Sequence, residues 1–233
     1  MIKLLIAIDG PAGSGKTTTA RLLAERLSYT YLDTGAMYRA ITLKVLQMGI
    51  LPTDEPKVVE TARKAHLMLK NVNGDLRVFL DGKDVTQEIR SEEVTQNVSI
   101  ISSYPGVREL LVEKQREIGA QKGCVVDGRD IGTVVFPDAD LKFFMVADVT
   151  ERAIRRQLEL SNGGREVPLV EVIRQIRERD EKDSSREFSP LRKAKDAILI
   201  DTTKMSIEEQ VEEIMRYVRE KTTSLKEEIR NEN

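Results

Sequence analysis

The sequence predicts an α/β fold in which helices cover both faces of a parallel sheet. Five short apolar runs recur along the 233 residues, and stretches with helical spacing of apolar residues separate them. Strands that alternate with helices pair in parallel, because each helix carries the chain back to the same edge of the sheet. A hydrophobic fraction of 40%, with 37 basic and 39 acidic residues, indicates one folded domain over residues 1–233.

The elements follow from apolar spacing and from the residues that interrupt it. Strands are predicted at Ile2–Ile8, Tyr29–Leu32, Cys124–Val126, Leu141–Val146 and Ile198–Ile200. Helices are predicted at about Lys16–Leu27, Ala36–Met48, Val107–Lys122, Thr150–Leu160, Leu169–Ser185 and Ser206–Ile229.

One region breaks the alternation of strands and helices. The runs His66–Val72 and Leu76–Leu80 flank Asn73-Gly74-Asp75. Asn-Gly between two β-rich runs is a strong local signal for a hairpin. We therefore expect an inserted small subdomain, part helix and part antiparallel hairpin, over about Thr53–Gln96.

The composition excludes several classes of protein. A formal net charge of −2 argues against a nucleic-acid polymer as partner, and a single cysteine, Cys124, excludes a disulfide framework and a Cys-rich zinc site. No apolar run approaches the roughly 20 residues that span a bilayer. The N-terminus shows no cleavable signal pattern. We expect a soluble cytoplasmic protein without a membrane partner, and a monomer because nothing indicates a dedicated interface.

The strongest motif follows the first predicted strand. Gly10-Pro-Ala-Gly-Ser-Gly-Lys-Thr17 matches G-x-x-x-x-G-K-[ST], with a buried strand before it and a helix after it. The glycines let backbone N–H groups converge on phosphate oxygens, and the start of the helix adds its positive end. Lys16 can reach the β- and γ-phosphates, and the Thr17 hydroxyl can ligate Mg²⁺. The motif predicts a phosphate-binding loop for a nucleoside triphosphate.

The rest of the chain carries arginines rather than the switch elements of a GTPase. No Asn-Lys-x-Asp and no Asp-x-x-Gly with a catalytic Gln is present. Arginines instead follow the second and third strands, in Asp33-Thr-Gly-Ala-Met-Tyr-Arg39 and Asp127-Gly-Arg-Asp130, where ligands bind in open α/β sheets. Planar guanidinium forks suit phosphate, so this pattern predicts a second phosphate ester facing the loop.

Two further arginine groups extend this pattern. Arg108 begins a helix after Tyr104-Pro105-Gly106. Arg179, Asp183 and Arg186 stand at i, i+4 and i+7, and therefore share one face of a helix or its end. Asn162-Gly163-Gly164 ends another arginine-rich helix, which makes about 150–168 a candidate mobile lid.

Four blocks, taken in order, resemble the bacterial cytidylate kinase family. They are Gly10–Thr18, Leu32–Arg39, Asp127–Pro137 and Glu178–Arg186. The resemblance implies a P-loop NTPase-type three-layer α/β/α fold with a five-stranded parallel sheet, an inserted acceptor-binding subdomain and a short lid. It also implies transfer of the γ-phosphoryl group of ATP, with Mg²⁺, to CMP or dCMP.

The resemblance also implies roles for individual residues. ATP would be bound by Gly10, Pro11, Ala12, Gly13, Ser14, Gly15, Lys16, Thr17 and Thr18, with the lid residues Arg152, Arg155 and Arg156 closing on its phosphates. Thr34, Tyr38 and Arg39 would line the acceptor nucleotide, and Arg39, Arg108 and Arg129 would hold its phosphate. Ser99, Asp130 and Arg186 would read cytosine, and Arg179 with Asp183 would meet the ribose. Lys16, Arg129 and Arg156 would carry catalysis.

The acceptor would be a phosphate oxygen that is mostly ionised at pH 7, so no general base is required. We accordingly expect the single histidine, His66, to be structural, and Asp33 and Asp127 to orient arginines or water around Mg²⁺. Two alternatives stay open on the residues alone. One is a P-loop kinase for another small acceptor, such as UMP, AMP or a phosphate-free metabolite. The other is a nucleotide-dependent switch or binding module without phosphotransfer.

Overall fold

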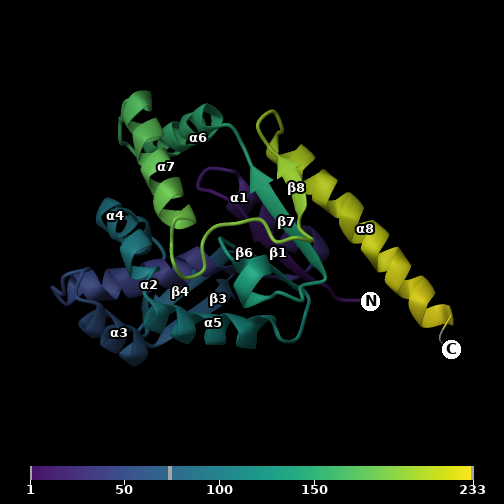
Figure 1. Cartoon of the computed structure of the whole chain (residues 1–233), viewed down its shortest axis with the longest axis horizontal. Coiled ribbons are helices and arrows are strands. Elements are labelled where there is room, and N and C mark those ends of the chain that lie inside the picture. The colour runs from purple at the N-terminus through teal and green to yellow at the C-terminus, as the bar shows by residue number, and fades with distance from the viewer. Residues whose placement is uncertain (1, 73–74, 232–233) are drawn as a thin grey trace.

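A sheet of five parallel strands forms the centre of the molecule in the computed structural model, which describes residues 2–72 and 75–231 (Figure 1). The strand order is β2 (Thr30–Asp33), β6 (Cys124–Gly128), β1 (Leu5–Asp9), β7 (Leu141–Val146) and β8 (Ile198–Asp201). Every neighbouring pair is parallel. The predicted fold class and its five strands are confirmed.

The sheet is covered on both faces because side chains alternate along its central strand. Ile6 and Ile8 of β1 pack in one apolar cluster, together with α1 (Lys16–Leu27) and α8 (Ile207–Asn231). Leu5 and Ala7 pack in a second cluster, which includes α2 (Thr34–Gln47) and α5 (Pro105–Gly119). A period of two along a strand produces these two faces, and each face becomes a separate core.

The inserted region contains the predicted hairpin. Its elements are α3 (Glu55–Lys64), β3 (Leu67–Val72), β4 (Asp75–Leu80), β5 (Lys83–Asp84), the 3₁₀ turn η1 (Glu88–Arg90) and α4 (Glu92–Ile101). β3 and β4 pair antiparallel, as predicted, while Asn73-Gly74 of the predicted turn lies outside the described residues. The short strand β5 was not predicted. It pairs with β4 after Asp81 and Gly82, whose φ angles of 50° and 85° reverse the chain.

Two helices stand over the carboxyl edge of the sheet, on the side opposite α3 and α5 in the view of Figure 1. They are α6 (Val149–Asn162) and α7 (Leu169–Ser184), and they pack through a small apolar cluster of their own. The arginine-rich helix ends at Asn162, as predicted. A π-helical turn, η2 (Ile131–Val135), follows β6. None of the described helices combines the length and apolarity that a membrane span requires.

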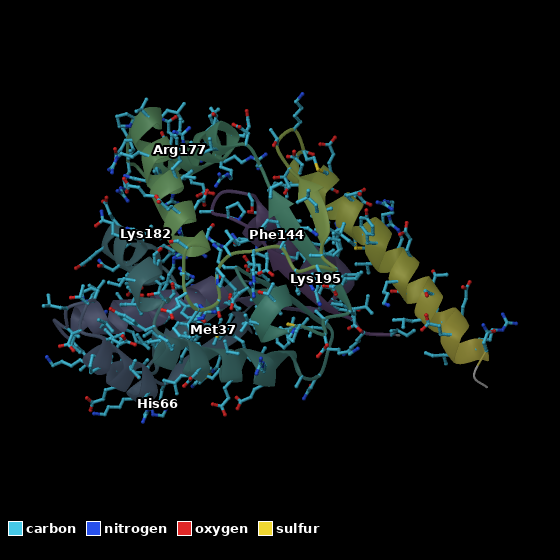
Figure 2. All side chains as sticks on the ribbon, in the orientation of Figure 1. Met37, His66, Phe144, Arg177, Lys182 and Lys195 are labelled. Atoms are coloured by element: carbon cyan, nitrogen blue, oxygen red, sulfur yellow. The ribbon has the colours of Figure 1, made fainter. Side chains whose placement is uncertain are left out.

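His66 lies at the outer edge of the inserted region, away from the centre of the molecule (Figure 2). Its side chain is exposed, and its backbone N–H donates to Asp81 Oδ1 at 2.9 Å. This contact uses the backbone of His66, and the structural role that we expected for the residue stays a prediction.

Candidate active site

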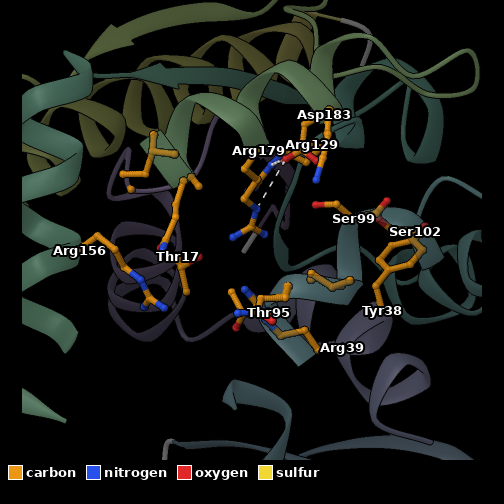
Figure 3. Close-up of a pocket in the computed structure, with 18 of the residues that line it drawn as sticks. Thr17, Tyr38, Arg39, Thr95, Ser99, Ser102, Arg129, Arg156, Arg179 and Asp183 are labelled. Atoms are coloured by element: carbon orange, nitrogen blue, oxygen red, sulfur yellow. Dashed lines mark hydrogen bonds and ion pairs between the residues drawn. The ribbon is translucent and has the colours of Figure 1, made fainter. Parts of the chain in front are cut away.

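A cavity of about 800 Å³ opens between the phosphate loop, α2, α4 and α7 (Figure 3). It lies where β1, β2 and β6 end, because the loops that follow parallel strands meet at one edge of the sheet. Most of the predicted site residues line it: Ala12, Gly13, Gly15, Lys16, Thr17, Thr18, Thr34, Tyr38, Arg39, Ser99, Arg108, Arg129, Asp130, Arg156, Arg179, Asp183 and Arg186. The structure therefore gathers into one cavity residues that lie up to 174 positions apart in the sequence, from Ala12 to Arg186.

The phosphate loop has the backbone shape that the motif predicts. Gly13 and Gly15 have φ angles of 77° and 88°, a region that side chains disfavour, and α1 begins at the next residue, Lys16. A Cβ atom on Gly10 would lie 2.2 Å from the Met145 carbonyl oxygen, so this glycine lets the loop pass close to β7. These positions explain why the loop requires glycine at three of its six residues.

Three carbonyl groups of the loop accept hydrogen bonds from side chains. The bonds run from Lys16 Nζ to Pro11 at 3.2 Å, from Arg152 Nη1 to Ala12 at 3.1 Å and from Thr202 Oγ1 to Ser14 at 2.9 Å. Arg152 and Thr202 do not line the cavity, so the Ala12 and Ser14 carbonyls are satisfied away from it, and this arrangement favours loop N–H groups that face an anion. Gly10, Pro11 and Ser14 do not line the cavity and belong to this outer side.

Lys16 is buried at the bottom of the loop. Burial, followed by the positive charge of Arg129, lowers the pKa of Lys16 below its ordinary value, and the neighbouring Asp127 opposes this shift. A buried ammonium group beside a guanidinium group is stabilised when an anion binds between them. The position and charge of Lys16 therefore fit the β- and γ-phosphates of a nucleotide.

Thr17 and Asp127 form a pair of oxygen ligands beside the loop. Thr17 Oγ1 donates to Asp127 Oδ2 at 2.8 Å, and Tyr31 donates its hydroxyl to Asp127 Oδ1 at 2.9 Å. Burial, followed by the charge of Asp33, raises the pKa of Asp127. Residues 2–72 and 75–231 contain no cluster of three or more His, Cys, Asp or Glu residues suited to a metal. This oxygen pair fits Mg²⁺, which binds through one or two protein ligands together with substrate phosphates.

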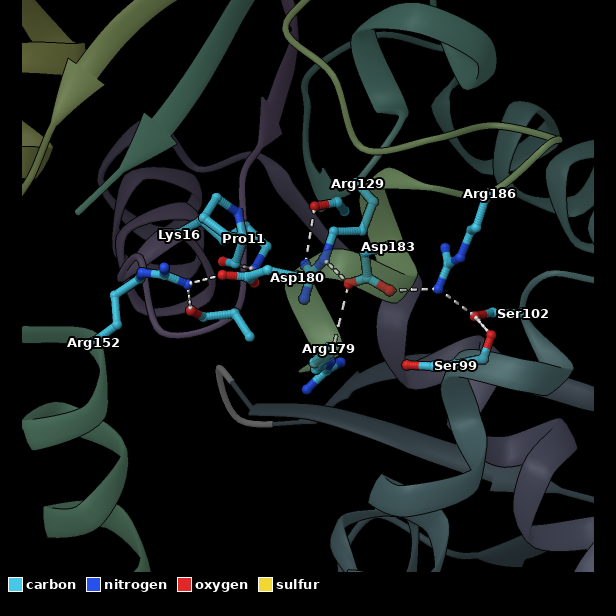
Figure 4. A network of polar contacts seen from close by, with 12 residues as sticks. Pro11, Lys16, Ser99, Ser102, Arg129, Arg152, Arg179, Asp180, Asp183 and Arg186 are labelled. Carbon is cyan, nitrogen blue, oxygen red and sulfur yellow. Dashed lines mark hydrogen bonds and ion pairs between the residues drawn. The ribbon is translucent and has the colours of Figure 1, made fainter. Parts of the chain in front are cut away.

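The opposite wall of the cavity is rich in arginine. Asp183 on α7 pairs with Arg129 at 2.9 Å and with Arg186 at 2.5 Å, and Arg179 lies 4.0 Å from the same carboxylate (Figure 4). Burial, followed by the charges of Arg129 and Arg39, lowers the pKa of Arg179 to about 9. Three guanidinium groups around one carboxylate leave an excess of positive charge in this part of the cavity.

Four arginines of the cavity each have a buried Nε atom without a hydrogen-bond partner in the described part of the chain. They are Arg39, Arg108, Arg179 and Arg186. An unpaired buried donor is destabilising, so such groups in native proteins point to a ligand or to ordered water. Burial also lowers the pKa of Arg39, and the negative charge of Asp33 opposes this shift. The donors fit a second anion, separate from the one at the phosphate loop.

Arg108 and Asp130 form an ion pair at the base of this wall, and both side chains are 6% exposed. Arg108 Nη1 also donates to the Ser102 carbonyl at 3.0 Å, and its guanidinium lies 5.4 Å from the centre of the Tyr38 ring. Ser102 Oγ accepts from Arg186 at 3.0 Å. These contacts attach the end of α4 to the arginine wall, close to Ser99, which lines the cavity from α4.

Two of the three lid arginines lie outside the cavity. Arg156 lines it, whereas Arg152 contacts the Ala12 carbonyl and Asp180. Arg155 Nη2 donates to the Thr202 carbonyl at 2.6 Å, so a contact of Arg155 with donor phosphates stays a prediction. Successive residues on a helix face different neighbours, so only tertiary contacts decide which arginine meets a ligand. A direct contact of Arg152 with donor phosphates stays a prediction.

The sequence analysis also missed residues of the site. Arg90 lines the cavity at the end of the inserted region, and its charge helps to lower the pKa of Arg39. Ser102 contacts two site arginines, but no motif marks it. Asp180 falls within the quoted block Glu178–Arg186, and its spacing of three residues from Asp183 is the signal that could have identified it.

The fold and the cavity together define a P-loop nucleotide-binding protein with an arginine-rich wall opposite its phosphate loop. The family model described as cytidylate kinase matches residues 6–220. The chain belongs to the cytidylate kinase family.

Relatives that carry this name match nearly the whole chain. The cytidylate kinase of Caldanaerobacter subterraneus subsp. tengcongensis is 55% identical over 217 residues, which cover 93% of this chain and 95% of the relative. That of Desulfitobacterium hafniense is 52% identical over 218 residues and covers 94% of each. Among solved structures, an uncharacterized protein from Eubacterium ventriosum is 14% identical, with a TM-score of 0.50, and covers 93% of this chain and 99% of that one. This last likeness concerns the fold alone.

Proposed function

We propose that the chain transfers the γ-phosphoryl group of ATP to CMP or dCMP, which yields ADP and CDP or dCDP. The observation that carries the proposal is the set of buried, unpaired guanidinium donors that face the phosphate loop across one cavity. Membership of the cytidylate kinase family supports cytidine nucleotides as the acceptors. The reaction needs two polyanions brought into line with their repulsion cancelled, and this arrangement of charges suits that requirement.

At the donor end, the loop N–H groups and Lys16 would bind the β- and γ-phosphates. Thr17 and Asp127 would hold Mg²⁺, which supplies positive charge to the phosphate oxygens when bound. Arg156 lines the cavity from α6 and is the lid arginine placed to approach the donor. Within residues 2–72 and 75–231, Arg156 forms an ion pair with the exposed Glu159 at 3.0 Å, and an exposed pair of this kind is easily exchanged for a phosphate.

At the acceptor end, Arg39, Arg108 and Arg129 would hold the phosphate of CMP, and Asp183 with Arg179 would meet its ribose. Arg39 and Arg129 share the cavity with the phosphate loop, and the charge of Arg129 acts on Lys16 of that loop. The attacking phosphate oxygen has a second pKa of about 6 and is already ionised at pH 7. The residues therefore position and neutralise the acceptor, and no side chain has to remove a proton.

Selection of cytosine would depend on Asp130, Ser99 and Arg186. A carboxylate can accept a hydrogen bond from the exocyclic amino group of cytosine, whereas uracil presents a carbonyl oxygen in that place. The carboxylate and the uracil carbonyl oxygen are both hydrogen-bond acceptors, so neither would find a donor in the other. A preference of about 10²-fold for CMP over UMP is therefore physically reasonable.

Exclusion of water would depend on the segment that joins α6 to α7. Arg165 in this segment forms an ion pair of 2.5 Å with Glu92 at the start of α4, and both residues line the cavity. This contact joins the candidate lid to the inserted region across the opening. A closed site protects ATP from hydrolysis while the acceptor is bound.

The decisive experiment is a panel of acceptors in an assay of ADP release with ATP and Mg²⁺. CMP, dCMP, UMP, AMP and cytidine are compared at equal concentrations, and Lys16→Met serves as the inactive control. We expect kcat/KM for CMP or dCMP to exceed that for UMP by at least about 10²-fold, with no turnover of cytidine. Preference for another acceptor, or no ADP release with CMP, would refute the proposal.

A further inference from the structure

Asp180 lies one helical turn before Asp183 on α7 and contacts a different part of the site (Figure 4). Its Oδ2 accepts from Arg152 Nη1 at 2.5 Å, and the two side chains are 23% and 9% exposed. The same Nη1 donates to the Ala12 carbonyl of the phosphate loop at 3.1 Å. Arg152 Nε donates to the Ala147 carbonyl at 3.0 Å, which fixes the guanidinium to the end of β7.

The Ala12 carbonyl has to face away from the cavity if the N–H groups of the loop are to face phosphate. A carbonyl in this orientation needs a donor on the outer side of the loop, and Arg152 provides it. The contact leaves little space, since a Cβ atom on Gly13 would lie 3.0 Å from Arg152 Cβ. The N-terminal part of α6 thus packs directly on the loop, and Asp180 balances the charge of the arginine between them.

The second carboxylate oxygen of Asp180 points to a role beyond stability. Oδ1 is buried and has no hydrogen-bond partner in the described ranges of the chain. A buried unpaired acceptor is destabilising, and native proteins retain such groups mainly at sites where they serve function. A neutral or apolar pair of similar volume would fill this space without that penalty.

We propose that Asp180 is a positioning residue for the donor nucleotide, which acts through Arg152 on the Ala12 carbonyl. The pair keeps the N–H groups of the phosphate loop aimed at the donor phosphates. α7 then serves both ends of the cavity, with Asp180 on the donor side and Asp183 on the acceptor side. This inference rests on the proposed function only in that the loop binds a nucleoside triphosphate.

The test compares Asp180→Asn, which removes the charge at constant shape, with Glu181→Gln, which removes an exposed charge from the next position on the same helix. The dissociation constant of a non-hydrolysable ATP analogue is measured with Mg²⁺ and without an acceptor, and KM is measured for ATP and for CMP. We expect Asp180→Asn to weaken binding of the analogue about tenfold, the effect of one charge-assisted hydrogen bond. KM for CMP in Asp180→Asn should stay within twofold of the wild type. For Glu181→Gln, the dissociation constant of the analogue and both KM values should stay within the same limit.

A double-mutant cycle tests whether Asp180 acts through Arg152. Lysine cannot reach Asp180, Ala12 and Ala147 together, so Arg152→Lys should weaken donor binding to a similar extent. The double variant should be no weaker than the weaker single variant, and Asp180→Glu should recover part of the loss. Unchanged donor affinity in Asp180→Asn, or additive losses of about 100-fold in the double variant, would overturn the proposal.

A purely structural role predicts a different pattern. In that case Asp180→Asn would weaken the binding of ATP and of CMP equally and would lower the midpoint of thermal unfolding. This outcome would also overturn the proposal. If Asp180→Asn does not fold, Asp180→Glu and Arg152→Lys supply the same comparison. Because the analogue is bound without an acceptor, a failure of CMP phosphorylation by the wild type would refute the proposed function and leave this test intact.

Discussion

Asp183 Oδ2 accepts a hydrogen bond from Arg129 Nε at 2.9 Å, although 54 positions separate the two residues. Burial alone would raise the pKa of Asp183, but Arg129, Arg186 and Arg179 hold it below its ordinary value. The carboxylate thus neutralises part of the positive charge of three buried arginines. Three guanidinium groups around one carboxylate leave net positive charge, which a bound anion would neutralise further.

Arg129→Ala should weaken CMP binding by about 10- to 100-fold and leave ATP binding within about threefold. The substitution removes a charge-assisted contact with the acceptor phosphate, while the phosphate loop keeps its own donors. Calorimetry with each nucleotide separately measures both affinities. Arg177→Ala, an exposed arginine on α7 outside the cavity, is the matched control. An unchanged affinity for CMP would remove Arg129 from the acceptor site.

Asp130→Asn should narrow the preference for CMP over UMP by at least about tenfold. Asparagine preserves the shape of the buried contact with Arg108, and its amide group can turn its NH₂ toward the uracil carbonyl. The ratio of kcat/KM for the two acceptors is the measurement, with the exposed Asp138→Asn as control. If the ratio is preserved, the base is read elsewhere in the cavity.

Lys16→Met should reduce turnover at least about 10³-fold while CMP binding stays within threefold of the wild type. Methionine fills the buried space but brings no charge to the donor phosphates, and the acceptor wall is left intact. Steady-state ADP release and CMP calorimetry separate the two effects. Equal loss of turnover and of CMP binding would instead indicate collapse of the whole cavity.

The local parts of the fold could be predicted because their signals are local. The observed α1 has the predicted bounds, Lys16–Leu27, since a glycine loop precedes it and apolar residues repeat along one face. The first strand was predicted at Ile2–Ile8 and lies at Leu5–Asp9. The bounds differ because a strand begins where it pairs with its neighbour, and β1 pairs with β6 only from Leu5 onward. The apolar composition of Ile2–Ile8 carries no information about that pairing.

The arginine-rich motifs predicted the composition of the cavity but not the partner of each side chain. Arg152, Arg155 and Arg156 lie within five positions of α6 and have three different surroundings: the phosphate loop, Thr202 and the cavity. Arg152 and Ala12 are 140 positions apart, so no spacing rule could pair them. Packing of α6 on the loop determines these contacts, and such packing has no signature in a short motif.

Asp9 gives a prediction about stability and pH. Both of its carboxylate oxygens accept backbone hydrogen bonds at 2.8 Å, from Ile131 and Gly132. Burial nevertheless raises the pKa of Asp9 from its ordinary 3.8 to about 7. As the pH rises from 4 to 7, the unfolded chain releases a proton that the folded chain retains. The free energy of unfolding should therefore fall, by at most about 1.4 kcal/mol per pH unit from this carboxyl group, and level off above pH 7.

Asp9→Asn removes this titration, so the stability of the wild type relative to the variant should decline between pH 4 and 7 and then stay constant. Urea unfolding at pH 4.5, 5.5, 6.5 and 7.5 measures the difference directly, with Asp138→Asn as a control that should show no such trend. The amide also loses one of the two acceptors, which destabilises the variant by a similar amount at every pH and does not affect the slope. A difference in stability that is constant from pH 4.5 to 7.5 would show that Asp9 is already ionised in the folded protein, held so by the N–H groups of η2.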